Sequence, residues 1–191
     1  KIFTELDDRE GLANCYITLG HTFKRKSDYP KALEYHKMAA DYMLTSGTKE
    51  RKGVVHLNLA EAYLLNNQLA SARVHIDSAF LLLDPLDYKV ALTACYRILG
   101  VINFKEKKWK EASVSFNQVL SLSEQLREFS QKEATTEALI YLARLSRIDG
   151  QSVLEREFLK QAISLAAQNN YLEHLRTSYL EMVEYYQRKQ D

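Results

Sequence analysis

The side chains best suited to bind metals are few in this 191-residue sequence, and their spacing forms no recognisable motif. None of the five histidines has a second histidine or cysteine three or four positions away, the spacing at which one helix face can close a metal site. These histidines are His21, His36, His56, His75 and His174. We interpret them as surface or packing residues, and we expect no metal and no other cofactor.

Phosphate binding and catalysis are also not expected. The six glycines include no glycine-rich loop of the kind that surrounds phosphates at a helix N-terminus. Without a nucleophile, metal or phosphate motif, we predict that the chain is not an enzyme.

Arg97, Arg144 and Arg147 are the remaining candidates for binding chemistry. The planar guanidinium group donates forked hydrogen bonds that match a carboxylate. These arginines are therefore candidates to hold acidic side chains or a terminal carboxylate of a partner. Ordinary surface charge is the better explanation of any one of them taken alone, and their occurrence in neighbouring repeats favours binding.

Charge and hydropathy argue against nucleic acid and membrane partners. The 26 basic residues nearly balance the 25 acidic ones, giving a net charge of +1. The basic run Lys105, Lys107, Lys108 and Lys110 is interrupted by Glu106, which is typical of a solvated turn. No apolar run approaches the roughly 18 to 20 residues that a membrane helix needs. A cytoplasmic location is expected.

A repeated pattern indicates the elements that position these residues. A large apolar residue followed by a smaller one recurs about every 40 residues, and helical apolar spacing surrounds each pair. Small or β-branched residues follow 12 and 19 positions later in three of the repeats. The pairs are Leu19-Gly20, Leu59-Ala60, Leu99-Gly100, Leu142-Ala143 and Met182-Val183; the later residues are Ala32, Ala39, Ala72, Ala79, Ala112 and Val119.

Caps and turns divide the pattern into helical hairpins. Asp28 is placed to cap a helix whose first turn contains Pro30, and Gly47 is a suitable stop. Asp84 and Pro85 are predicted to cap and start the next helix. A turn is expected at residues 149–151.

Gly20 and Gly100 fall inside predicted helices, where glycine is disfavoured by about 1 kcal/mol relative to alanine. A packing reason must offset this, so we expect the two helices of a hairpin to approach closely at these positions. Aromatic residues are expected to fill the gaps between hairpins. Cys15 and Cys95 occupy equivalent repeat positions, which lie far apart, so buried free thiols are expected and no disulfide.

The pattern resembles the tetratricopeptide repeat, which has a leucine-small pair in its first helix and alanines in its second. Residues 16–23 and 28–33 match it best. The repeat here has about 40 residues in place of 34, which resembles the lengthened repeats of signalling adaptors and bacterial regulators. Asn103 replaces an aromatic residue and Glu155 replaces the first alanine of a second helix, so these repeats depart from the family pattern.

The resemblance implies an all-α fold, a right-handed α-solenoid of antiparallel helix pairs wound into a superhelix. We expect one elongated domain that is a fragment of a longer protein. Its predicted segments are the tail of a preceding helix, four repeats and a final helix. They cover residues 1–9, 11–47, 50–83, 85–127, 131–168 and 171–189.

The resemblance also places ligand binding on the first helices, in a concave groove of mixed apolar and basic character. Asn58 stands where similar repeats hydrogen-bond an extended peptide backbone, although a solvated polar residue explains it as well. The chaperone-type clamp for a terminal carboxylate matches this chain at one position of five. The expected groove residues are Asn14, Ile17, His21, Lys24, Leu57, Asn58, Glu61, Arg97, Val101, Ile140, Tyr141, Arg144 and Arg147, with Glu137, Thr177, Leu180, Glu181 and Glu184 on the same face.

Two functional hypotheses follow. The first is a protein-interaction scaffold that binds a peptide or an extended partner segment in the groove, as the sensory or docking region of a larger signalling protein. The alternative is a structural spacer or dimerisation module of a bacterial multidomain regulator, with no separate ligand. A homodimer would fit the alternative.

Overall fold

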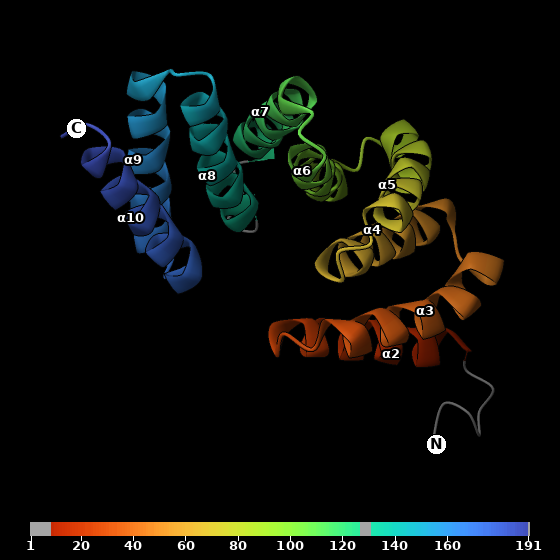
Figure 1. Cartoon of the computed structure of the whole chain (residues 1–191). Coiled ribbons are helices and arrows are strands. Elements are labelled where there is room, and N and C mark those ends of the chain that lie inside the picture. Colours follow the sequence, from red (N-terminus) through yellow and green to blue (C-terminus); the bar gives the residue numbers. More distant parts are fainter. Residues whose placement is uncertain (1–8, 127–130, 191) are drawn as a thin grey trace. The chain divides into compact units, whose positions relative to one another are not determined.

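The computed structural model describes residues 9–126 and 131–190. Within these ranges the chain is all-α, as predicted, and successive helices pack against one another in antiparallel pairs (Figure 1). Nearly all of the predicted tail at residues 1–9, and the end of the segment 85–127, lie outside the described residues. The division into repeats within a single domain stays a prediction.

The described residues fall into two compact units that divide between Ile98 and Leu99, inside α6. In the first unit α2 pairs with α3 and α4 pairs with α5; in the second, α8 pairs with α9, and α10 packs against α9. The helices are α2 (Arg9–Arg25), α3 (Tyr29–Ser46), α4 (Lys49–Leu65), α5 (Leu69–Leu83), α6 (Lys89–Lys105), α7 (Trp109–Leu126), α8 (Lys132–Ile148), α9 (Ser152–Gln168) and α10 (Leu172–Gln187).

The predicted caps of α3 are confirmed. Asp28 accepts a hydrogen bond from the backbone N–H of Lys31 at 3.3 Å, and Pro30 lies in the first turn, where a missing N–H costs little. Gly47 ends the helix and donates its own N–H to the carbonyl of Met43 at 2.8 Å. The predicted turn at residues 149–151 is also present, with Gly150 at a φ of 70°.

The prediction that Asp84 and Pro85 start the next helix is wrong. They form a single 3₁₀ turn, Asp84–Leu86, and α6 begins only at Lys89. Asp87 follows the turn in the left-handed conformation, with a φ of 48°. This conformation interrupts the right-handed helical path, so the helix cannot continue from Pro85.

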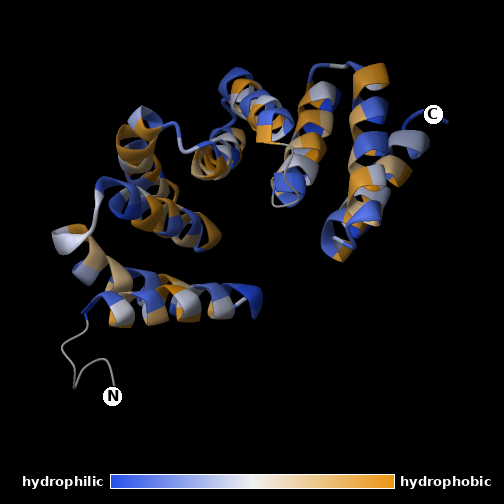
Figure 2. Cartoon of the chain, turned by 180° about the vertical axis from the view of Figure 1, so that it is seen from behind, coloured by the Kyte–Doolittle hydropathy of each residue, from blue (hydrophilic) through white to orange (hydrophobic). Residues whose placement is uncertain are grey.

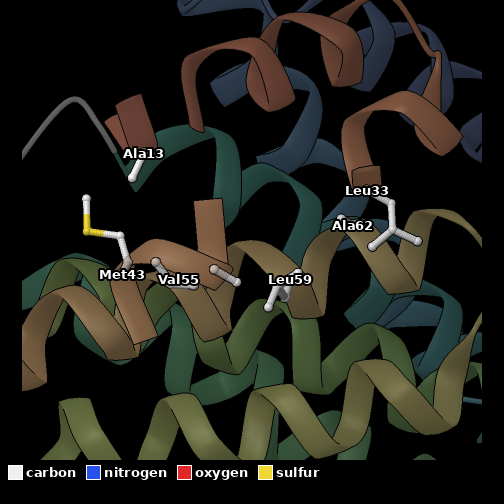
Figure 3. Close-up of a cluster of buried hydrophobic side chains, with 7 residues drawn as sticks. Ala13, Leu33, Met43, Val55, Leu59 and Ala62 are labelled. Atoms are coloured by element: carbon white, nitrogen blue, oxygen red, sulfur yellow. The ribbon is translucent and has the colours of Figure 1, made fainter. Parts of the chain in front are cut away.

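Each helix carries hydrophobic and hydrophilic residues along its length, so it buries one side (Figure 2). In the first unit the buried sides of α2, α3 and α4 meet in one apolar cluster that includes Ala13, Leu33, Met43 and Leu59 (Figure 3). In the second unit α8 and α9 share a cluster of Leu139, Ile140 and Ala162, while Ala143 and Leu159 pack with Tyr185 of α10.

The predicted close approach of paired helices is confirmed at both interior glycines. A Cβ atom at Gly20 would lie 2.6 Å from the His36 ring of α3, and one at Gly100 would lie 2.7 Å from the Phe116 ring of α7. Both distances are well below van der Waals contact. The small residues of the second helices, Ala32, Ala39, Ala72, Ala79, Ala112 and Val119, are all buried.

The expectation that both thiols are buried is wrong for one of them. Cys15 is exposed, because its position on α2 faces away from the apolar cluster, whereas Cys95 is buried as expected. Leu19 is also 38% exposed, although the equivalent Leu59 and Leu142 are buried. Both outliers lie on the first helix that the structure describes, where one side has no described helix against it.

Asn103, which departs from the repeat pattern, is buried and donates from Nδ2 to the Ser115 hydroxyl of α7 at 3.5 Å. The neighbouring Phe104 supplies the aromatic packing instead. Its ring lies 5.2 Å from that of Trp109 and 5.0 Å from that of Tyr141, centroid to centroid.

Replacing Gly100 with alanine tests the close approach. Alanine gains about 1 kcal/mol of helix propensity, but its methyl group overlaps the buried Phe116 ring, and overpacking costs about 1 to 3 kcal/mol. We expect Gly100→Ala to lower the free energy of unfolding in urea by about 1 kcal/mol. In a Phe116→Leu background the same change should be neutral or stabilising. Equal effects of Gly100→Ala in both backgrounds would contradict the contact.

Candidate functional site

In the first unit, three successive first helices share one carboxylate. Glu61 of α4 accepts a hydrogen bond from Lys24 Nζ of α2 at 2.6 Å and another from Arg97 Nη2 of α6 at 2.5 Å. Burial alone would raise the pKa of Glu61, but the charges and hydrogen bonds of Arg97 and Lys24 outweigh it and lower the pKa to about 2. Glu61 is therefore ionised at any physiological pH.

The second unit contains a larger ionic cluster, built by α8, α9 and α10. Arg144 of α8 donates from Nε to Glu181 of α10 at 2.8 Å. Arg147, one turn later, donates from Nε to Glu155 of α9 at 2.9 Å and from Nη1 to Glu184 at 3.0 Å, and it also bonds Glu181. Although burial opposes it, the hydrogen bonds and charges of Glu155 and Glu181 raise the pKa of Arg147.

Glu155 explains a departure from the repeat pattern. Its side chain is only 1% exposed, yet it stands where the family has a small residue. In addition to Arg147, Arg188 donates from Nη2 to the same Glu155 oxygen at 2.5 Å. Two guanidinium groups thus compensate the buried charge. Without them, an ionised carboxylate at this depth would carry a large desolvation cost.

These contacts change the expected role of the three arginines. Arg97, Arg144 and Arg147 were candidates to bind a partner's carboxylate, and each instead bonds a carboxylate of its own chain. The residues involved lie about one repeat apart, as Lys24 and Glu61 or Arg144 and Glu181 do. The stacking of equivalent helices brings these positions into contact.

A pocket of about 230 Å³ opens between α8 and α10. Five of its seven lining residues were assigned to the groove face from the sequence. Tyr141 forms part of its wall, with its ring stacked on Phe116 at 4.9 Å and the Arg144 guanidinium 5.1 Å from its centroid. The lining residues are Glu137, Ile140, Tyr141, Arg144, Glu173, His174 and Thr177.

The other predicted groove residues differ in exposure. Asn14 is exposed, and Ile17 and Asn58 are half-buried. Leu57, Val101 and Ile140 are buried, 9%, 5% and 3% exposed, so they offer little surface to a partner. His21 is half-buried, and burial followed by the charge of Lys24 lowers its pKa.

The structure also pairs histidines that sequence spacing within one helix did not connect. His36 lies under Gly20 with its ring 5.1 Å from that of His21. His56 and His75 place their Nδ1 atoms 2.9 Å apart, and Tyr63 stacks on His75. The 19-residue separation of His56 and His75 equals the spacing of the small residues in paired helices. The contact between these two histidines could therefore have been predicted from that spacing.

Within 9–126 and 131–190, no group of three or more His, Cys, Asp or Glu side chains is arranged to hold a metal ion. None of the helices in these ranges has the length and apolarity required to cross a bilayer.

The fold is that of the tetratricopeptide-like repeat proteins. Chains of this type align with the present chain over most of its length, at sequence identities that establish the fold alone. No protein-family model matches the sequence. No curated protein matches it either.

Three solved structures illustrate the similarity. BtubC from P. vanneervenii is 20% identical, with a TM-score of 0.69 over 85% of this chain and 66% of its own. A putative kinesin light chain from Podospora anserina, with TPR-like repeats, is 17% identical, with a TM-score of 0.65 over 91% and 85%. A STAND ATPase from Pyrococcus horikoshii, with a tetratricopeptide repeat sensor, is 16% identical, with a TM-score of 0.75 over 94% of this chain and 27% of its own.

The ionic cluster of the second unit predicts unequal roles for two carboxylates that bond the same arginine. Glu155→Gln removes a buried charge and leaves Arg188 and Arg147 undercompensated, so we expect a loss of about 2 kcal/mol in the free energy of unfolding. Glu184 is 59% exposed, so Glu184→Gln should cost less than about 1 kcal/mol. Urea denaturation of both variants measures this. Equal losses would show that Glu155 is not specially compensated.

His36 predicts a dependence of stability on pH. Burial, followed by the charge of His21, lowers its pKa from 6.5 to about 4. The folded state therefore holds His36 neutral while the unfolded state takes up a proton below pH 6.5. The contribution of the neutral His36 to the free energy of unfolding is fully present above pH 6.5. It is lost as the pH falls towards 4, by at most about 3 kcal/mol.

The free energy of unfolding, measured in urea between pH 7 and pH 4.5, checks this loss. Glu61 stays ionised in the folded protein across this window, and its unfolded form begins to take up protons only at the lower end, near its ordinary pKa of 4.5. His36→Gln should flatten the pH dependence whatever its effect on absolute stability, while His174→Gln serves as control. An unchanged slope in His36→Gln would assign the titration to another group.

Proposed function

We propose that the chain is a protein-interaction module whose first-helix face binds an extended segment of a partner protein, as the docking or sensory part of a larger protein. The observation that carries this proposal is the pocket between α8 and α10. It is formed by side chains of two first helices, Tyr141 and Thr177 among them, on the face that the family resemblance assigns to ligands.

The ionic clusters support the same proposal. They fix the arginine side chains of the face before any partner arrives, so a ligand would not have to order them. Preorganised side chains reduce the entropy lost on binding. The Pyrococcus structure, in which a similar array is described as a sensor, is consistent with a recognition role.

A second candidate function is self-association through α10. Five large apolar side chains of this helix are exposed among the described residues. Isolated exposed hydrophobic residues are ordinary on a protein surface, but five on one helix are more than that. They are Leu172, Tyr179, Leu180, Val183 and Tyr186. A structural or dimerisation role would cover them with a second copy of the chain.

Peptide selection tests the leading proposal. A random dodecamer library displayed on phage is selected against the 191-residue chain, and recovered peptides are synthesised for affinity measurements. Asn58→Trp and Thr177→Trp place a bulky ring on the face of each unit. We expect one or both of them to weaken the recovered peptides at least about tenfold, a loss of about 1.4 kcal/mol.

Ser164→Trp, on the exposed side of α9, is the matched control and should leave affinity unchanged. Recovery of no peptide, or of peptides indifferent to both face variants, would contradict the proposal. Sedimentation equilibrium of the same chain tests the second candidate. A dimer that dissociates in Leu180→Glu with Val183→Glu would favour self-association.

A further inference from the structure

We propose that His56 of α4 and His75 of α5 share one proton in a hydrogen bond that holds the two helices together, and that further protonation in mildly acid solution opens it. The two Nδ1 atoms lie 2.9 Å apart. The ring centroids are 5.2 Å apart, farther than the nitrogens, so the rings meet through these two atoms. The bond is a property of the α4–α5 pair itself and holds whatever the first-helix face binds.

The distance of 2.9 Å between the two ring nitrogens requires a proton between them. Two lone pairs facing each other this closely would repel, whereas one N–H donating to one lone pair gives an ordinary hydrogen bond. One ring therefore carries its proton on Nδ1, and the other carries its proton on Nε2. A metal ion held in line between the same atoms would need them about 4 Å apart, since metal–nitrogen bonds are roughly 2.0 to 2.1 Å long.

An aromatic neighbour fixes the orientation of one ring. Tyr63 of α4 stacks on His75 with 5.2 Å between centroids and an angle of 8° between the ring planes. Both histidines are half-buried, so their outer atoms remain accessible to water and protons. The stacking keeps the Nδ1 atom of His75 directed towards α4.

The charges nearest the pair are positive. Lys37 of α3 lies 5.4 Å from the Tyr63 centroid and acts on His75. Lys52 lies one turn before His56, on the same side of α4. Charged residues farther from the pair are exposed or lie on other sides of their helices: Glu34 and Asp41 of α3, Arg73 and Asp77 of α5, and Asp84 of the 3₁₀ turn.

Burial and these charges oppose protonation of the pair. Burial lowers the pKa of His56, and burial followed by the charges of His56 and Lys37 lowers the pKa of His75. Unfolded imidazoles, with an ordinary pKa of 6.5, take up protons more readily. The contribution of the pair to stability is therefore fully present above pH 6.5 and is lost as the pH falls through the lowered pKa values of the folded state.

The two protonation steps differ in their consequences. The first added proton binds Nε2 of the ring that donates Nδ1–H, and the imidazolium keeps that N–H and its bond to the neutral ring. The second added proton must bind the accepting Nδ1, which removes the acceptor and leaves two positive rings in contact. The second step therefore breaks the bond and releases α5 from α4 at this point.

Nuclear magnetic resonance of the 191-residue chain, labelled with nitrogen-15 in its histidines, tests the shared proton. At neutral pH we expect a scalar coupling between the Nδ1 atoms of His56 and His75, and a slowly exchanging Nδ1–H proton far downfield. Such a coupling passes through the hydrogen bond, so two rings that merely lie close cannot produce it. Uncoupled rings whose N–H protons exchange as fast as those of His174 would overturn the proposal.

A titration to lower pH tests the release. The coupling should persist through the first step and vanish with the second, and hydrogen exchange of the α5 amides, corrected for its intrinsic rate, should then rise at least about tenfold. The amides of α9, in the other unit, are the control and should show no step at that pH. Independent single-step titration of the two rings, or loss of the coupling at the first step, would contradict the proposal.

Two variants assign the steps to this pair. His56→Gln should abolish the coupling and leave His75 with one titration step at higher pH. Lys37→Gln, at an exposed position, keeps both rings and should move the second step to higher pH, because it removes an opposing positive charge. Lys26→Gln, exposed in the turn before α3, is the matched control and should change neither step. Equal titrations of the Lys37 and Lys26 variants would contradict the assignment.

Discussion

The close approach of the two helices within a pair is the constraint on which the other features depend. At Gly20 and Gly100 no side chain separates the helices, and a ring of the second helix, His36 or Phe116, occupies the space. Because each first helix is held this closely on one side, its opposite side faces outward at a fixed orientation. Residues about one repeat apart, such as Lys24 and Glu61, are then within hydrogen-bonding distance of each other.

These ion pairs between neighbouring first helices determine the electrostatic character of the face. Arginines that look like free donors in the sequence are bonded to carboxylates of a neighbouring first helix, and in the second unit also to Glu155 of the helix between them. The face is therefore ordered and largely self-neutralised. What this face offers to a partner in the second unit includes the pocket between α8 and α10, with Tyr141 and Thr177 among its lining residues.

The helices, the small positions and the caps of α3 could be predicted from the sequence, because they depend on spacing within one helix or one turn. The 3₁₀ turn at Pro85 could not, since it depends on the left-handed Asp87 that follows. Glu155 was recognised as a departure, but its compensation needs Arg188, 33 positions away. The arginine pairing could not be predicted for the same reason. The carboxylate that each arginine meets depends on how the helices stack, which the arginine's own sequence neighbourhood does not specify.

The most direct test is nuclear magnetic resonance of the arginine Nε–H groups of the unliganded chain. Arg144 and Arg147 each donate Nε–H to a carboxylate, so their resonances should be shifted away from those of free arginine and exchange slowly with water, and should do so in high salt. Glu181→Gln and Glu155→Gln should remove the two shifts one at a time. Arginine resonances at the free position, exchanging rapidly in the wild-type chain, would contradict the claim that the chain's own carboxylates hold the arginines of this face.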